Sequence, residues 1–224
     1  MKLAIIAFCI LAMAVPVFAN DLKNVPTENG SASDRTDCDV SGCDYYFGDF
    51  YTWAEVNSEF YRVGPLTTGG SCTITNVVLE IDIEQTWIGD LIIDLYYDED
   101  MDGTYDYGPV SALCRPQLDG CPIDDCCGCS GDAFGVYTFG DDGADPMGEV
   151  DCPAAIPNGC YMPAIESAGF AATFAGATAG GHWYLEILDG AAGDETYLNG
   201  FGVYVCCGTT ASESTTWDQI KTVY

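Results

Sequence analysis

Basic residues are scarce in this sequence. Its 224 residues include six Lys or Arg and one His against 35 Asp or Glu, which gives a formal net charge of −29 at pH 7. Nucleic acids and anionic lipid surfaces are bound through clusters of Lys and Arg, so we exclude both as partners. A surface this acidic attracts divalent cations and keeps a protein soluble. The same composition is also an adaptation to high salt, and the sequence leaves both interpretations open.

Long apolar runs and catalytic signatures are missing beyond the N-terminus. No later segment approaches the ~20 apolar residues of a membrane span, and no phosphate loop or dinucleotide fingerprint occurs. His182 is the only histidine, and nothing beside it suggests the nucleophile and orienting carboxylate of a catalytic triad. Carboxylate pairs suited to glycoside hydrolysis arise by chance among 35 acids and carry no signal. We therefore expect no enzymatic activity.

The N-terminus has the pattern of a secretory signal peptide. Lys2 provides a positive charge, residues 3–15 form an apolar core, and small residues at 17 and 19 precede the polar Asn20. This apolar core is too short for a stable membrane anchor. We expect residues 1–19 to be removed on export, so that the mature protein is secreted and acts outside the cell or at its surface.

Cysteines are numerous for an acidic protein of this length. Of the 13 cysteines, Cys9 lies in the expected signal peptide, so 12 remain. An even number in an exported protein indicates disulfides, here six. The alternative is zinc ligation by the cysteines at 126–129, but structural zinc sites use two separated pairs of ligands. Adjacent cysteines, at 126–127 and 206–207, seldom pair with each other, so each is expected to bond to a different partner.

Hydrophobic and polar residues alternate along several short segments. The clearest are 76–84 and 90–98, and 183–187 and 201–205 follow the same pattern near the C-terminus. A period of two is typical of half-buried strands, because successive side chains point to opposite faces of a sheet. Many short strands separated by turns rich in Gly and Asp predict an all-β protein, an antiparallel, jelly-roll-like β-sandwich.

We expect four regions along the chain. After the signal peptide, residues 20–71 form a leader and an extension rich in cysteine and aromatic residues, with one or two strands near 45–61. Residues 72–207 form the β-sandwich. Residues 208–224 form a short tail with apolar residues on one face of a helix. The tail either docks on the sandwich or is recognised by an export or anchoring system or by a neighbouring subunit.

Five segments of the sandwich carry short motifs in a characteristic order. They are 89–95 (GDLIIDL), 139–142 (FGDD), 156–163 (IPNGCYMP), 174–189 (FAGATAGGHWYLEILD) and 198–201 (LNGF). In order and spacing they resemble the P domain found beside proprotein convertases and bacterial subtilisin-like proteases. The resemblance spans residues 72–207 and implies a jelly-roll sandwich, often calcium-stabilised, that serves as a non-catalytic companion or interaction module. The cysteines depart from the family pattern, and this sequence contains no protease domain, so the role of steadying a catalytic neighbour does not transfer directly.

The segment 98–106 (DEDMDGTYD) has the spacing of a calcium loop. Its acids at alternate or near-alternate positions are Asp98, Asp100, Asp102 and Asp106. Calcium takes six to eight hard oxygen ligands, and Gly103 permits a tight turn. The twelfth position, a bidentate Glu in an EF-hand, is Pro109, and the flanks are expected strands. We therefore expect an Asp-rich calcium loop of another kind; the alternative is an acidic hairpin loop in an acidic protein.

Asp141 and Asp142 form a second candidate calcium site. The resemblance implies that Asp90 and Asp145 lie near them at one edge of the sandwich. The alternative is a set of solvated loop acids, and the sequence does not separate the two interpretations.

Six aromatic residues lie close together in the expected extension: Tyr45, Tyr46, Phe47, Phe50, Tyr51 and Trp53. They suggest a sugar-binding platform, although aromatic residues in strands more often pack in a core. We expect the protein to work by binding or assembly, with protein partners or copies of itself. An accessory role beside a separate secreted protease, carbohydrate binding, and an unrecognised hydrolase are the alternatives.

Overall fold

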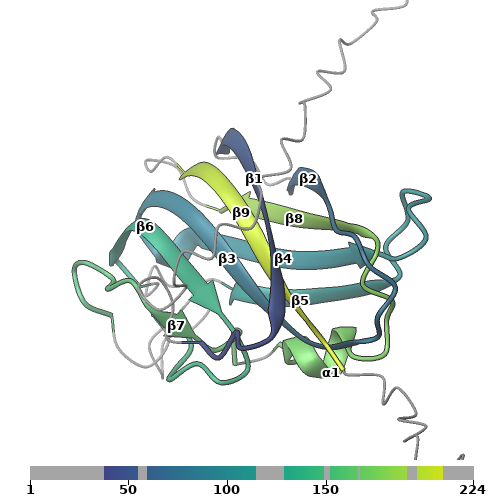
Figure 1. The fold of residues 1–224 in the computed structure, drawn as a ribbon. Helices are drawn as coiled ribbons and strands as arrows, with labels where there is room; N and C mark the ends of the chain where they lie inside the picture. Colours follow the sequence, from purple (N-terminus) through teal and green to yellow (C-terminus); the bar gives the residue numbers. More distant parts are fainter. Residues whose placement is uncertain are drawn as a thin grey trace, which may run out of the picture.

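A computed structural model describes residues 38–54, 60–114, 129–148, 152–165, 167–190 and 196–208. Two β-sheets pack face to face (Figure 1). Sheet A has the order β1 (Cys43–Ala54), β9 (Thr196–Cys207), β3 (Ile74–Thr86), β6 (Asp132–Phe139) and β7 (Cys160–Tyr161). Sheet B has the order β2 (Tyr61–Thr67), β8 (His182–Asp189), β4 (Leu91–Asp98) and β5 (Tyr107–Cys114). Within these described strands only the β6–β7 pair is parallel. The expected all-β sandwich is confirmed.

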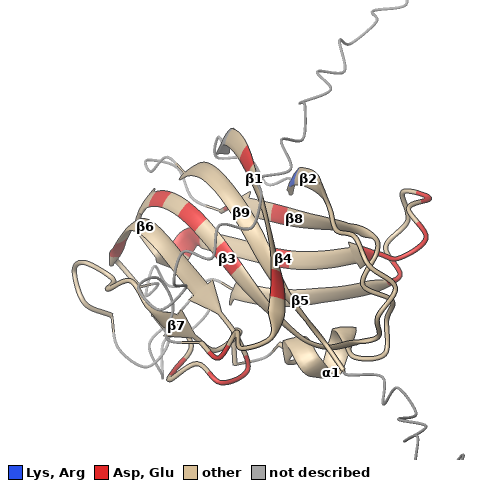
Figure 2. Cartoon of the chain, viewed as in Figure 1, with Lys and Arg blue, Asp and Glu red and all other residues tan. Residues whose placement is uncertain are grey.

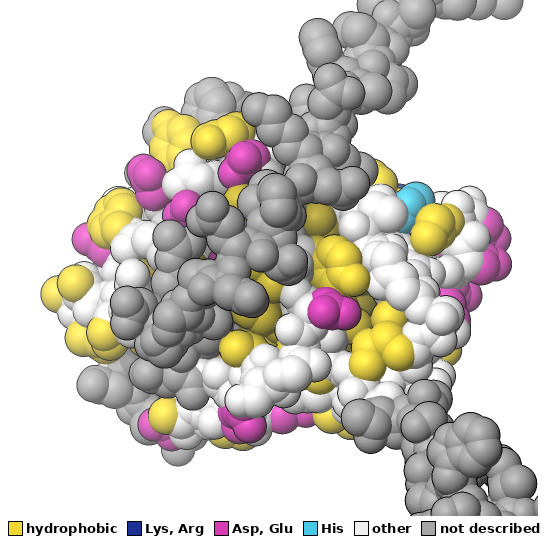
Figure 3. Space-filling model, in the orientation of Figure 1, with side chains coloured by type: hydrophobic (Ala, Val, Ile, Leu, Met, Phe, Trp, Pro, Cys, Tyr) yellow, Lys and Arg dark blue, Asp and Glu magenta, His cyan; other side chains and the backbone are white. Residues whose placement is uncertain are grey.

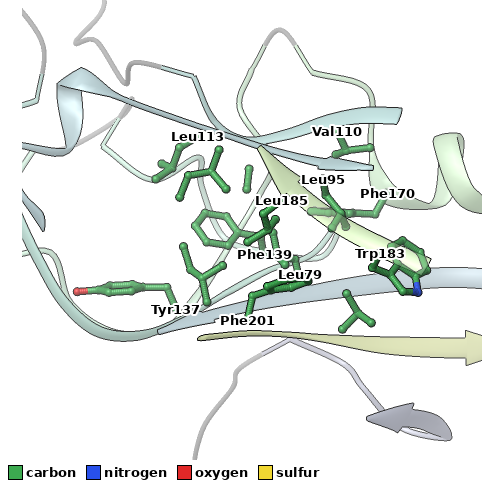
Figure 4. Packing of buried hydrophobic residues seen from close by; sticks show 14 of the residues in the cluster. Leu79, Leu95, Val110, Leu113, Tyr137, Phe139, Phe170, Trp183, Leu185 and Phe201 are labelled. Atoms are coloured by element: carbon green, nitrogen blue, oxygen red, sulfur yellow. The ribbon is translucent and has the colours of Figure 1, made fainter. Parts of the chain in front are cut away.

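The core lies between the two sheets, as Figure 4 shows. Alternate residues of β3 and β4 point into it, as their period of two predicts. The buried residues on these strands include Val77, Leu79, Ile81, Ile83, Leu91, Ile93, Leu95 and Tyr97. Trp183 of β8 is fully buried, and its ring centroid lies 4.2 Å from that of Tyr97 and 5.1 Å from that of Phe174 in the short helix α1 (Phe170–Phe174). Each large apolar side chain buried in this way stabilises the fold by about 1.5–3 kcal/mol.

Two strands precede residue 72, in the region expected to be an extension. β1 pairs with β9 and β2 pairs with β8, both antiparallel, so each forms an edge of its sheet. The sandwich therefore begins with β1 and is not confined to the segment after residue 72. At the other end of the sandwich, the last described strand, β9, ends at Cys207.

Four disulfides connect distant parts of the sandwich. They are Cys38–Cys160, Cys43–Cys206, Cys72–Cys207 and Cys129–Cys152. The neighbours Cys206 and Cys207 bond to different partners, as expected for adjacent residues of a strand. Since Cys129 is bonded to Cys152, it offers no thiolate to a metal, and the zinc alternative loses one of its ligands.

The aromatic residues of β1 are divided between its two faces. Tyr46 and Phe50 pack against the core. Tyr45 and Phe47 point outward and keep 37% and 40% of their surfaces exposed. Core packing therefore accounts for Tyr46 and Phe50 but not for Tyr45 and Phe47.

Several expectations fall outside the described residues or side chains. They concern the signal peptide 1–19, the leader 20–37, Cys121, Cys126, Cys127, the side chain of Trp53 and the tail after residue 208. In the described part of the chain, no helix has the length and apolar character needed to cross a membrane.

Candidate metal centre

The acidic loop between β4 and β5 reverses the chain at one end of sheet B, where Figure 2 colours its Asp and Glu residues red. Asp98, the last residue of β4, has none of its surface exposed. Two residues adopt left-handed backbone conformations, Met101 with φ 62° and Gly103 with φ 92°. Gly103 suits this conformation because it has no Cβ. The sequence signal for a tight turn at this glycine therefore agrees with the structure.

Carboxylates of the loop accept hydrogen bonds from its own backbone. Asp98 Oδ1 accepts from the N–H of Asp102 at 3.2 Å, and Asp98 Oδ2 accepts from Gly103 at 2.9 Å. Asp102 Oδ1 accepts from the N–H of Thr104 at 2.8 Å. Asp106 Oδ2 accepts from the N–H of Glu99 at 2.8 Å and so closes the loop across its base. These bonds hold the carboxylates in place before any ligand arrives.

Three of the four candidate calcium ligands in this loop converge. Asp98, Asp100 and Asp106 each place a carboxylate oxygen within 4.8 Å of the other two. Asp102 is not in this group; its carboxylate is engaged with Thr104. Carboxylate oxygens are the hard ligands that calcium prefers, and further ligands come from backbone carbonyls and water in such loops. The donor set therefore fits calcium.

Mutual repulsion in this cluster acts on the pKa of Asp100. Its side chain accepts a hydrogen bond from the N–H of Asp102 at 3.2 Å, which by itself lowers the pKa. Desolvation and the charges of Asp102, Asp106 and Asp98 outweigh that bond and raise the pKa of Asp100 above its ordinary value. A bound cation reverses this balance, because an opposite charge within a few ångströms favours the ionised carboxylate.

Glu99 fastens the loop to the turn that precedes β8. Its Oε1 accepts from the N–H of Thr178 at 2.8 Å, and its Oε2 accepts from the phenol of Tyr107 at 3.1 Å. Hydrogen bonding by Thr178 lowers the pKa of Glu99. This role is not predictable from the local sequence, because Thr178 lies 79 residues further along the chain.

Tyr105 fastens the other side of the loop to the outer face of sheet B. Its ring stacks on Tyr96 with centroids 4.2 Å apart, and its phenol donates to Glu186 Oε1 at 2.8 Å. The guanidinium carbon of Arg62 lies 4.5 Å from the centroid of the Tyr105 ring and 3.8 Å from that of Tyr184. A change in the acidic loop is therefore coupled to β2, β4 and β8. No local pattern marked Tyr105 in the sequence.

The second candidate calcium site has a different character. Asp141 accepts from the N–H groups of Phe170 and Ala171, at 2.7 and 2.8 Å, and so caps the start of α1. Asp142 Oδ2 accepts from the N–H of Asp39 at 2.7 Å. These bonds account for both acids as structural groups.

Asp142 does lie close to two sulfur atoms, those of Cys38 and Cys160. These two cysteines form a disulfide and supply no thiolate. Asp90, in a 3₁₀ turn before β4, belongs to neither of the two candidate metal-binding groups found in the described residues. The loop between β4 and β5 is therefore the stronger candidate.

Comparisons with known proteins found a weak structural similarity. No family model matches the sequence, and no curated protein matches it. Two of the matching solved structures are a serine protease from Aeromonas sobria, alone and in complex with its chaperone. Each is 13% identical with a TM-score of 0.40, over 72% of this chain and 26% of the protease chain. The present chain thus matches about a quarter of that protein, and a likeness this weak carries no argument about function.

Proposed function

We propose that this protein is an exported, non-catalytic, P-domain-like binding module whose β4–β5 loop holds calcium. Its ligand classes are a protein partner, a second copy of the chain, or a glycan. The motifs that resemble the P domain supply central parts of the fold: 89–95 forms a 3₁₀ turn and much of β4, and 182–189 forms β8, with Trp183 in the core. This placement supports the resemblance.

The convergence of Asp98, Asp100 and Asp106 within 4.8 Å carries the calcium proposal. Three carboxylates this close are costly without a counter-charge, and hydrogen bonds from the loop backbone already fix their positions. Calcium bound here ties the last residue of β4 to the residue just before β5. Through Glu99 and Tyr105 it also steadies the contacts of the loop with the rest of sheet B.

Export is supported by the disulfides. Four form among the described residues, and disulfides persist in oxidising compartments outside the cytosol. The expected signal peptide at residues 1–19 supports the same conclusion.

The test is isothermal calorimetry of the exported protein with calcium and, separately, with magnesium. The wild type is expected to bind calcium with measurable heat and magnesium much more weakly, because magnesium demands a stricter octahedral geometry. Asp100→Asn combined with Asp106→Asn should abolish the calcium signal. A matched control, Asp44→Asn combined with Asp49→Asn on β1, removes the same charge from the other sheet and should leave the calcium signal unchanged. Absence of calcium heat in the wild type would show that the proposal is wrong.

A further inference from the structure

Two aromatic rings lie along the outer face of sheet A. Tyr45 and Phe47 of β1 point away from the core, and β9, the neighbouring strand, has Gly202 and Gly200 beneath them. A Cβ on Gly200 would come within 2.6 Å of the Phe47 ring, and one on Gly202 within 2.8 Å of the Tyr45 ring. The far ends of both rings therefore cross over β9, which is open only because these positions are glycine. More than a third of each aromatic side chain stays exposed to solvent.

Fixed neighbours hold the Tyr45 ring in place, and the Phe47 ring lies beside it. The phenols of Tyr45 and Tyr204 both donate to the carboxylate of Glu80, which is only 3% exposed. The ring of Tyr45 stacks on that of Tyr204 with centroids 4.4 Å apart and planes 27° apart. The rings of Tyr45 and Phe47 are 6.3 Å apart with planes at 29°. Rings so nearly parallel form a platform and not a cage, and their fixed positions reduce the entropy lost on binding.

Polar groups lie beside the rings. Strand β3 pairs with β9 so that Asp82 faces Gly200, and Glu84 follows on the same outer face. Asn199 of β9 directs its amide at both, with Nδ2 3.4 Å from Asp82 Oδ1 and 3.5 Å from Glu84 Oε1. Carboxylates accept hydrogen bonds, and an amide both donates and accepts. Tyr45, Phe47, Asp82, Glu84 and Asn199 are called the sheet A platform below.

We propose that the sheet A platform binds a neutral glycan. The C–H face of a pyranose ring is attracted to the negative face of an aromatic ring, and its hydroxyls can donate to Asp82 and Glu84. Acidic side chains lie among hydrophobic ones on the face drawn in Figure 3, and a chain of net charge −29 repels uronate or sulfated glycans. A small cation would gain most from rings on several sides, which a flat platform does not offer.

This inference deepens the proposed function, on which it rests, because it selects the glycan among the ligand classes of the binding module. The platform belongs to sheet A, whereas the acidic loop joins two strands of sheet B. Glycan binding and calcium binding can therefore fail separately, and each can be measured without the other.

The experiment uses the exported protein in pull-downs with insoluble cellulose and chitin, and in native gels containing xylan, mannan or a β-glucan. Alginate serves as an anionic probe and poly-lysine as a cationic one. We expect retention by at least one neutral polysaccharide, little changed by added salt. Phe47→Ala should weaken it about tenfold, the contribution of one stacked ring.

Phe60→Ala is the matched control, because Phe60 is 47% exposed and lies outside the platform; it should bind as the wild type does. Asp82→Asn combined with Glu84→Gln provides a second test that leaves every ring in place, and it should also weaken retention. The melting temperature of each variant shows that it is folded.

Three results would overturn the inference. The first is that no neutral polysaccharide retains the wild type. The second is that both the Phe47 variant and the double carboxylate variant bind as tightly as the wild type. The third is that poly-lysine alone is bound and salt abolishes the binding, which would point to a cationic protein partner. A protein that binds a neutral polysaccharide but gives no heat of calcium binding would instead refute the calcium proposal and leave this one standing.

Discussion

Asp100→Asn should change the stability of the protein in opposite directions with and without calcium. Without the ion, the Asp100 carboxylate lies within 4.8 Å of those of Asp98 and Asp106, and its pKa is raised by desolvation and by neighbouring charges despite a hydrogen bond that lowers it. Asparagine removes one negative charge and keeps an acceptor for the N–H of Asp102. The metal-free variant is therefore expected to melt at a higher temperature than the metal-free wild type.

With calcium the order reverses. An ion that binds only the folded state stabilises it by about 2.7 kcal/mol when its concentration is a hundred times Kd. For extracellular calcium modules Kd is roughly 10⁻⁴–10⁻³ M, so about 10 mM calcium meets this condition at the tighter end of that range. In a domain of this size about 1 kcal/mol shifts the melting temperature by about 2–4 °C, so the wild type should gain about 5–10 °C and the variant much less.

The assay is thermal unfolding followed by circular dichroism, in a chelator and in about 10 mM calcium, at low ionic strength so that the repulsion is not screened. Asp44→Asn is the single-charge control, and its stability should shift by the same small amount in both conditions. If Asp100→Asn destabilises the protein equally in both, the acid has a structural role only. If the wild type does not respond to calcium at all, the reasoning about the loop is refuted.

Three further predictions concern protonation, the core and the disulfides. Because the folded-state pKa of Asp100 is raised, its ionised carboxylate destabilises the fold at neutral pH, and this cost is relieved as pH falls through that pKa. In urea unfolding without metal, the stability advantage of Asp100→Asn over the wild type should therefore shrink towards acid pH. An advantage that grows towards acid pH would contradict this reasoning. The indole N–H of Trp183 donates to Thr68 Oγ1 at 3.2 Å, so Thr68→Val leaves this N–H unpaired in the core and should lower the free energy of unfolding by about 1–3 kcal/mol, measured in urea. Thr68→Ser keeps the hydroxyl and should cost less. Equal losses for the two variants would argue against the hydrogen bond. All 12 cysteines after residue 19 are expected to be oxidised, so intact mass after alkylation without reductant should show no added label, and labelled thiol would count against six disulfides.

The strands and the acidic loop were predictable because their signals are local. In β3 and β4 the alternation of apolar and polar residues is set by neighbours one and two positions away, and the buried faces are those that the alternation indicates. The spacing of Asp98, Asp100 and Asp106 likewise lies within one turn of chain, so their convergence followed from the segment itself. Asp102 was the exception: its carboxylate accepts from Thr104 and is not in the group of converging carboxylates.

Which cysteines pair with each other could not be predicted from local sequence. The even number of cysteines after residue 19 predicted disulfides, and the chemistry of adjacent cysteines predicted that Cys206 and Cys207 have separate partners. Their actual partners, Cys43 and Cys72, are 163 and 135 residues away. Only the pairing of β1 with β9, and the approach of Cys72 to the end of β9, selects these bonds.

The position of β1 is the feature that depends most clearly on the tertiary structure. Its aromatic residues occur on both faces, so the segment lacks the alternation that identifies β3, and the sequence predicts a strand of an extension there instead of a strand of the sandwich. Pairing with β9 turns Tyr46 and Phe50 inward, and lays Tyr45 and Phe47 over Gly202 and Gly200.

What the sequence determined by itself is therefore composition and short-range order: an acidic chain with the cysteine pattern of an exported protein, a sandwich built of alternating strands, and an Asp-rich loop. The tertiary structure decided which strands are neighbours and in what register. A one-residue slip in register exchanges the two faces of a strand, and alternation alone does not specify the partner strand. The anchoring of Glu99 on Thr178, and the platform shared by β1, β9 and β3, depend on those long-range pairings, since their residues meet only after the sheets have formed.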